Sequence, residues 1–161
     1  MQSHKMLLEV EEEPFSLIAI YASMEGFKMA YLLNKVLKIH LEREREDVDF
    51  NFDDYRAAFP LYTFKEARTQ CSFHLVANKF KGEPKKIVSS GSLFDEEEIS
   101  PKEVYLIPEY KKVDYFLKIG EEIEGKAFSR MLTKIGKIPQ VQAAYAIEPE
   151  LLKSKQNLIF E

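Results

Sequence analysis

Short apolar runs divide the chain into predicted strands, and two longer stretches have the spacing of helices. The segment 15–22 is apolar and bounded by Pro14 and Ser23, which predicts a strand buried on both faces. Short apolar or alternating runs predict further strands at 5–11, 39–45, 61–65, 71–79, 113–119 and 141–147. The chain is therefore expected to be rich in sheet.

The first predicted helix spans 25–38, and apolar residues cover much of its circumference. Its main apolar face contains Ala30, Leu33 and Leu37, which recur at intervals of three to four residues. We interpret this helix as part of the core; the alternative is that its wide apolar surface forms a second interface. Ser23 is expected to cap its N-terminus by accepting a backbone hydrogen bond.

The second predicted helix, 122–137, is amphipathic and ends near Gly136 and Pro139. Its inward side is expected to contain Ala127, Phe128, Met131, Leu132 and Ile135. Four basic residues at intervals of four, four and three form a stripe along it: Lys126, Arg130, Lys134 and Lys137. Such a stripe is typical of contact with a phosphate backbone or an acidic protein, and also of an ordinary solvated helix surface.

Two β-α-β units are expected, one near each end of the chain. They combine 17–22, 25–38 and 39–45, and then 113–119, 122–137 and 141–147. Two such units on one mostly antiparallel sheet predict an α+β protein with a ferredoxin-like α/β plait and extra strands. Residues 1–161 are expected to form a single domain, because two domains would each be small.

Polar and charged stretches predict the connections between these elements. The stretch 46–58 is polar with interleaved aromatic residues, and we expect it to be irregular. The stretch 80–101 contains glycine, proline and clustered charges, which predicts a long flexible loop. The tail, about 149–161, ends in the apolar residues 158–160, so we expect it to dock on the sheet rather than stay in water.

Composition places the chain among ordinary globular proteins, with 45% hydrophobic and 31% charged residues. No apolar run is long enough to span a bilayer, and the acidic N-terminal segment is unlike a secretory signal. Cys71 is the single cysteine, which agrees with a reducing cytoplasm. The net charge of −4 gives no general electrostatic reason to expect nucleic-acid binding.

Recognisable motifs for catalysis or metal binding are absent from the sequence. Cys71 and His74 have a C-x-x-H spacing, but residues three apart on a strand point to opposite faces, and there is no second pair. Cys71 is instead expected on one side of its strand with Phe73, Leu75 and Ala77. The glycines are isolated and the histidines scattered. We therefore expect no metal, no cofactor and no small-molecule substrate.

The segment 105–119 combines a turn with a buried strand. Pro108 suits the first position of a short helical turn, in which Glu109 is favoured by exposed N–H groups. Three residues at intervals of three are expected on one side of this turn: Ile107, Tyr110 and Val113. Glu109 and Asp114 are the best candidates for carboxylates with a specific role. They are either an acid–base pair or, as we favour, structural acceptors of backbone hydrogen bonds.

The spacing I-P-E-x-x-x-V-D-Y in this segment resembles the signature of the bacterial IPExxxVDY family. The residues that carry the resemblance are Ile107, Pro108, Glu109, Val113, Asp114 and Tyr115. The similarity extends to 32–37, 137–147 and 152–160. The family has no established activity, so the resemblance implies no catalytic residue.

These observations favour a small cytoplasmic, non-catalytic domain that binds a protein partner or itself. The alternative is an accessory factor in RNA metabolism that uses the basic stripe of the second helix. A third hypothesis is an enzyme that uses Glu109 and Asp114, which the missing catalytic motifs disfavour.

Overall fold

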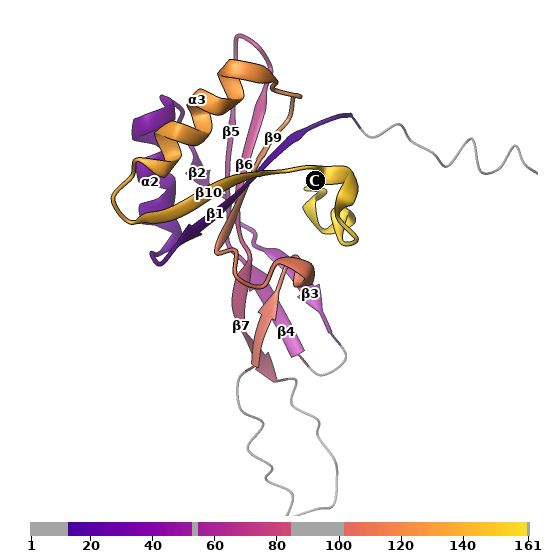
Figure 1. Cartoon of the computed structure of the whole chain (residues 1–161). Coiled ribbons are helices and arrows are strands. Elements are labelled where there is room, and N and C mark those ends of the chain that lie inside the picture. The colour runs from indigo at the N-terminus through magenta and orange to yellow at the C-terminus, as the bar shows by residue number, and fades with distance from the viewer. Residues whose placement is uncertain (1–12, 53–54, 85–101, 161) are drawn as a thin grey trace, which may run out of the picture.

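The computed structural model describes residues 13–52, 55–84 and 102–160. These ranges contain ten strands and two α-helices (Figure 1). The strands are β1 Ser16–Ala22, β2 Glu42–Arg43, β3 Val48–Asn51, β4 Tyr55–Phe59, β5 Leu61–Lys65, β6 Ser72–Ala77, β7 Lys79–Pro84, β8 Lys102–Tyr105, β9 Tyr115–Ile119 and β10 Val141–Ile147. The α-helices are α2 Gly26–Leu37 and α3 Gly125–Gly136, and short 3-10 helices lie at η1 Pro108–Tyr110, η2 Pro149–Leu151 and η3 Lys155–Leu158.

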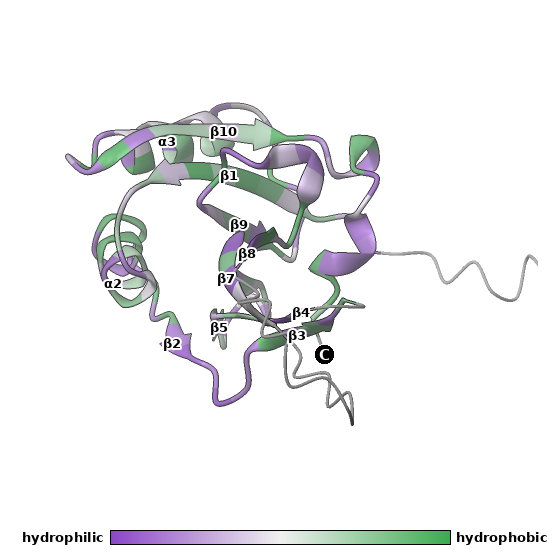
Figure 2. Ribbon diagram, turned by 90° about the horizontal axis from the view of Figure 1, so that it is seen from below, coloured by the Kyte–Doolittle hydropathy of each residue, from purple (hydrophilic) through white to green (hydrophobic). Residues whose placement is uncertain are grey.

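The main sheet has six strands in the order β10-β1-β9-β6-β5-β2, and every neighbouring pair is antiparallel. The most deeply buried of these is β1, which lies between β9 and β10, far later in the sequence. Leu17, Ile18 and Ile20 of this strand are fully buried, so the prediction of a strand buried on both faces is confirmed. Figure 2 shows the same strand as predominantly hydrophobic.

Both α-helices cover one face of the main sheet (Figure 1). From α2, Met29, Ala30 and Leu33 enter the core, which confirms that this helix is a core element. The prediction that Ser23 caps α2 is wrong, because the N-cap residue is Glu25 and its side chain makes no capping bond. The chain instead turns sharply just before the helix.

The second helix, α3, is shallower than its sequence pattern predicts. Ile135 is fully buried, whereas Phe128, Met131 and Leu132 are half-buried against the core. Ala127 is exposed, so its predicted inward position is wrong. The helix packs on β10, the last strand of the sheet, and therefore has fewer neighbours than a central helix.

A second sheet, in the order β3-β4-β7-β8, and the C-terminal segment cover the other face. The prediction that 46–58 is irregular is wrong, because β3 and β4 lie within it. Phe50, Ala57 and Phe59 belong to a second core cluster, on the face of the main sheet away from the helices. Asp49, Asn51 and Arg56 are exposed. The prediction of a loop over 80–101 is wrong for 80–84, which belong to strand β7. Residues 85–101 of that loop and the strand predicted at 5–11 lie outside the described residues.

Two long strands bend from the main sheet into the second one. Pro60 separates β4 from β5, and Asn78 separates β6 from β7. The two bends are adjacent, since the N–H of Ala77 donates to the carbonyl oxygen of Pro60 at 3.1 Å. A proline suits such a break because it cannot donate to the strand ladder.

The α+β class and the mostly antiparallel sheet are confirmed. The predicted strand at 39–45 is reduced to the two residues of β2, at the far edge of the sheet beyond β5. Ile39 and Leu41 are instead buried against α2, where the side chain of Asn34 bonds both backbone groups of Leu41. In the second predicted unit, β9 and β10 are parallel to one another with β1 between them.

Candidate functional site

The signature segment begins with the turn that its sequence predicts. Pro108 is the first residue of η1, and Glu109 lies in its first turn. The three residues expected on one side, Ile107, Tyr110 and Val113, all belong to the second core cluster. That part of the prediction is confirmed.

A buried asparagine, Asn78, holds the signature segment against the bend between β6 and β7. Its side-chain nitrogen donates to the carbonyl oxygens of Tyr110 and Val113, both at 2.8 Å. Its side-chain oxygen accepts the N–H of Ile107 at 2.8 Å. Backbone bonds from Asn78 to Asp114 and Leu106, each 2.9 Å, complete the set. Asn78 was not predicted from the sequence; its only signal was a lone amide directly after the apolar strand β6.

Asp114 links the signature to the end of β1. One carboxylate oxygen accepts the N–H of Ala22 at 2.8 Å, and the other lies 3.0 Å from the ammonium nitrogen of Lys79. Its own N–H donates to the carbonyl oxygen of Ile20 at 3.0 Å. The carboxylate therefore satisfies a backbone donor where the strand ends, as the structural interpretation predicts.

Glu109 links the signature to the C-terminal segment. One of its oxygens accepts the N–H groups of Lys153 at 3.0 Å and of Ser154 at 3.2 Å. Nearby, the side chain of Asn157 donates to the carbonyl oxygen of Leu106 at 2.8 Å. The two signature carboxylates thus bond different segments, one at the end of β1 and one in the tail.

Tyr115 completes the signature and fixes the turn before α2. Its hydroxyl donates to the carbonyl oxygen of Met24 at 2.5 Å. Burial raises the pKa of this hydroxyl to about 12, with Tyr62 and Asp114 adding to the effect. The phenol therefore stays protonated and remains a donor at neutral pH.

Cys71 and His74 lie on opposite faces of the main sheet, as predicted. Cys71 is buried in the core beneath the helices, and burial raises the pKa of its thiol to about 11. His74 stacks on Phe160 with ring centroids 5.1 Å apart, and burial beside Lys118 lowers its pKa to about 4. Its Nδ1 atom has no hydrogen-bond partner among the described residues. This ring is neutral at pH 7, and it borders a polar cavity of about 680 Å³.

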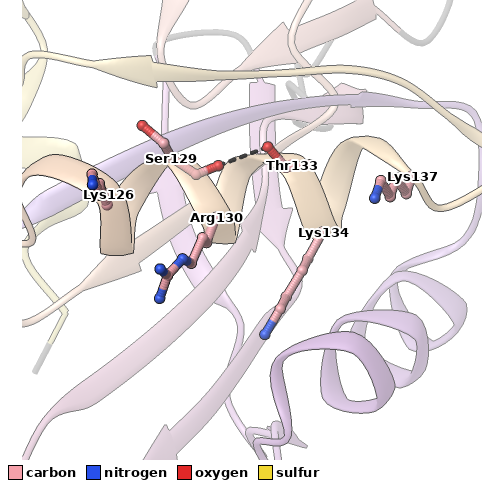
Figure 3. Close-up of a pocket in the computed structure, with 6 residues that line it drawn as sticks. All are labelled: Lys126, Ser129, Arg130, Thr133, Lys134 and Lys137. Atoms are coloured by element: carbon pink, nitrogen blue, oxygen red, sulfur yellow. Dashed lines mark hydrogen bonds between the residues drawn. The ribbon is translucent and has the colours of Figure 1, made fainter.

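The basic stripe of α3 is solvent-exposed along its whole length. Lys126, Arg130, Lys134 and Lys137 line a shallow hollow of about 400 Å³ together with Ser129 and Thr133 (Figure 3). The salt bridges found within the described ranges, Arg43–Asp47 and Lys79–Asp114, include none of these four cations. The stripe is therefore available to an anion.

The edge of the main sheet formed by β10 is a surface that was not predicted from the sequence. Four strands form the edges of the two described sheets, and three of them contain charges. These are β2 with Glu42 and Arg43, β3 with Asp49, and β8 with Lys102 and Glu103. The seven residues of β10 contain none, and Figure 2 contrasts its colours with the hydrophilic β2.

No family model, curated protein or solved structure matches this chain. Within the described ranges, no three His, Cys, Asp or Glu residues gather as metal ligands would. The helices described are all too short or too polar to cross a membrane.

An exposed aromatic residue lies on the same uncharged edge. Tyr145 of β10 is 57% exposed, and its ring meets that of Tyr21 edge-on at 5.6 Å. Both rings lie on the face away from the helices, since Tyr145 pairs with Ala19, whose side chain belongs to the second core cluster. On its other side from β1, β10 pairs with no described strand, so this edge combines main-chain hydrogen-bonding groups with the exposed ring of Tyr145.

Proposed function

We propose that this protein is a small non-catalytic domain that binds a protein chain, either a partner or another copy of itself, through the outer edge of β10, with which no other described strand pairs. The observation that carries the proposal is the absence of charge along all seven residues of this edge. Charged side chains are a common device by which edge strands avoid pairing, and the other three described edges have them. A strand added here gains main-chain hydrogen bonds.

The bonds of the signature residues support the non-catalytic part of the proposal. Glu109 and Asp114 both accept backbone N–H groups, and these acceptors join segments distant in sequence. A catalytic carboxylate needs a free oxygen directed at a reacting atom, whereas both oxygens of Asp114 have partners, the N–H of Ala22 and the ammonium group of Lys79. We therefore assign the signature segment a structural role: its hydrogen bonds hold it to β1, to the bend between β6 and β7, and to the C-terminal segment.

Hydrogen exchange of the β10 amides tests this proposal. The amides that point away from β1 are expected to gain protection in concentrated protein or in host-cell extract. Tyr145→Lys is expected to abolish that gain, because an arriving strand would have to desolvate the new charge. The control is Tyr31→Lys on α2, a tyrosine that is 63% exposed and away from this edge. Equal exchange under all conditions would overturn the proposal.

RNA binding through the basic stripe of α3 is a second candidate function. The observation in its favour is that the four cations are exposed and outside the salt bridges of the described residues. Their spacing along one helix suits successive phosphates better than a single small anion. This candidate uses a different surface from β10, so the two are separable.

Fluorescence anisotropy with a short labelled single-stranded RNA at low salt tests the second candidate. Changing Lys126, Arg130 and Lys134 to glutamine is expected to weaken binding strongly. The slope of log affinity against log salt concentration is expected to fall by about 2 in magnitude, if each cation meets one phosphate. The control makes the same charge change on α2: Lys28→Gln, Lys35→Gln and Lys38→Gln. Unchanged affinity in the stripe variant, or equal losses in both, would contradict an RNA-binding stripe.

We also propose membership of the IPExxxVDY family, a cytoplasmic location and a ferredoxin-like plait. Support for the family is the complete spacing from Ile107 to Tyr115. Support for the plait is the strand order β10-β1-β9-β6, with both α-helices on one face of these strands. On this proposal β5 and β2 extend the plait at one edge, and the second sheet is inserted within it. The single cysteine agrees with a reducing compartment.

A further inference from the structure

We infer that the strand bound at the β10 edge is β10 of a second copy, paired antiparallel about a two-fold axis through Ala144. This inference rests on the proposed function, since it uses the same edge. It adds the identity of the partner and the register of the pairing. The result is a symmetric dimer with one continuous twelve-stranded sheet, six strands from each copy.

The sequence of β10 is complementary to itself in this register. With Ala144 at the centre, Ala144 faces its own equivalent in the second copy. Tyr145 faces Ala143 on the face away from the helices, so the exposed large side chain meets a small one. No charge meets a like charge, because the strand has none. A strand with a central lysine or glutamate would repel its own copy in this arrangement.

The size and exposure of the edge also favour a second copy. An axis through Ala144 makes the two seven-residue strands overlap along their whole length, with the irregularity at Gln142 near one end of each strand. A shift of the axis by one residue leaves two residues of each strand outside the overlap. Tyr145 is 57% exposed in the single chain, and pairing places the small side chain of Ala143 beside it. Symmetric pairing of this kind is isologous and closes at two copies, so it does not lead to fibres.

Pairing at β10 brings the two α3 helices onto the same face of the joined sheet, because α3 packs on β10. Both helices have an exposed basic stripe, so their like charges oppose association. Salt screens such repulsion. The dimer is therefore expected to tighten as salt concentration rises, the reverse of an association held by opposite charges.

Cysteine cross-linking tests the register. Ala144→Cys is expected to give covalent dimers on mild oxidation or with a short bis-maleimide linker, because the two thiols face each other across the axis. The matched control is Ala146→Cys on the same face of the same strand, whose thiols would lie about 13 Å apart along the strands. Equal cross-linking of both variants, or none in either, would overturn the proposed register.

Sedimentation equilibrium tests the partner. The wild-type chain is expected to dimerise with rising concentration, and Tyr145→Lys to raise the dissociation constant by about tenfold or more, because two lysines then flank the axis. Tyr31→Lys is expected to leave it unchanged. A chain that stays monomeric at every concentration would overturn the inference. If extract then still protects the β10 amides, the proposed function stands with another protein as partner; if it does not, both fail.

Discussion

Replacing Asn78 with alanine is expected to lower the free energy of unfolding by about 3–5 kcal/mol, the largest effect of any single polar substitution in this protein. The change removes three side-chain bonds and leaves the carbonyl oxygens of Tyr110 and Val113 and the N–H of Ile107 buried without these partners. The carbonyl oxygen of Tyr110 still accepts the N–H of Val113 at 3.1 Å, but the carbonyl oxygen of Val113 and the N–H of Ile107 keep their desolvation penalty. Thermal unfolding is expected to shift down by roughly 10 °C.

Two further variants separate the role of the amide from a general loss of packing. Asn78→Asp keeps the shape but replaces the donor with an oxygen facing two carbonyls, so it is expected to be at least as destabilising as alanine. Asn157→Ala removes a single, half-buried bond to Leu106 and is expected to cost only about 1 kcal/mol. Similar melting temperatures for Asn78→Ala and Asn157→Ala would show that the side-chain bonds of Asn78 do not hold the signature segment in place.

Leu158→Ala is expected to destabilise the protein by about 2–4 kcal/mol, because it empties a fully buried site in the second core cluster. The tail around it is held by several contacts. Lys118 donates to the carbonyl oxygen of Leu158 at 2.8 Å, and Phe160 stacks on His74. Denaturant unfolding followed by circular dichroism measures the difference.

The neighbouring residue supplies a matched control for the tail. Ile159 has the same number of carbon atoms as Leu158 but is 53% exposed, so Ile159→Ala is expected to cost less than about 1 kcal/mol. Equal effects of the two substitutions would mean that the tail does not pack in solution as it does here. A large effect confined to Leu158 would establish the tail as part of the core.

The elements with strong local patterns could be predicted from the sequence. The run around Ile18 is apolar, and apolar residues recur at helical spacing around Leu33 in α2 and around Ile135 in α3. For this reason β1, α2, α3 and β10 were predicted near their observed positions. Pro108 predicted its turn because its fixed φ and missing N–H act locally. The acceptor role of Asp114 follows from the chemistry of a carboxylate next to a strand.

What the sequence could not predict depends on contacts between distant segments. Phe50 alternates with polar residues over a run too short to distinguish from a loop, and Phe59 follows two alanines, which have no strong strand preference. Pairing of β3 with β4 in the second sheet makes both segments strands. The bonds of Asn78 join residues about 30 positions apart, so no local pattern indicates them. The free edge of β10 is likewise a property of strand order, which the strand's own residues do not specify.

The central position of β1 has a consequence for how the protein is made. Both neighbours of this strand, β9 and β10, are synthesised in the last third of the chain. Ser16 also bonds Glu121 and Ile123, more than one hundred positions away. At about 5–20 residues per second, the 125 residues from Ala22 to Ile147 take roughly 6–25 s to translate. For the first 97 of these residues, up to Ile119, the most apolar strand has neither of its partners, and β10 joins only at the end of the interval. The nascent chain therefore cannot complete its core until β10 has left the ribosome.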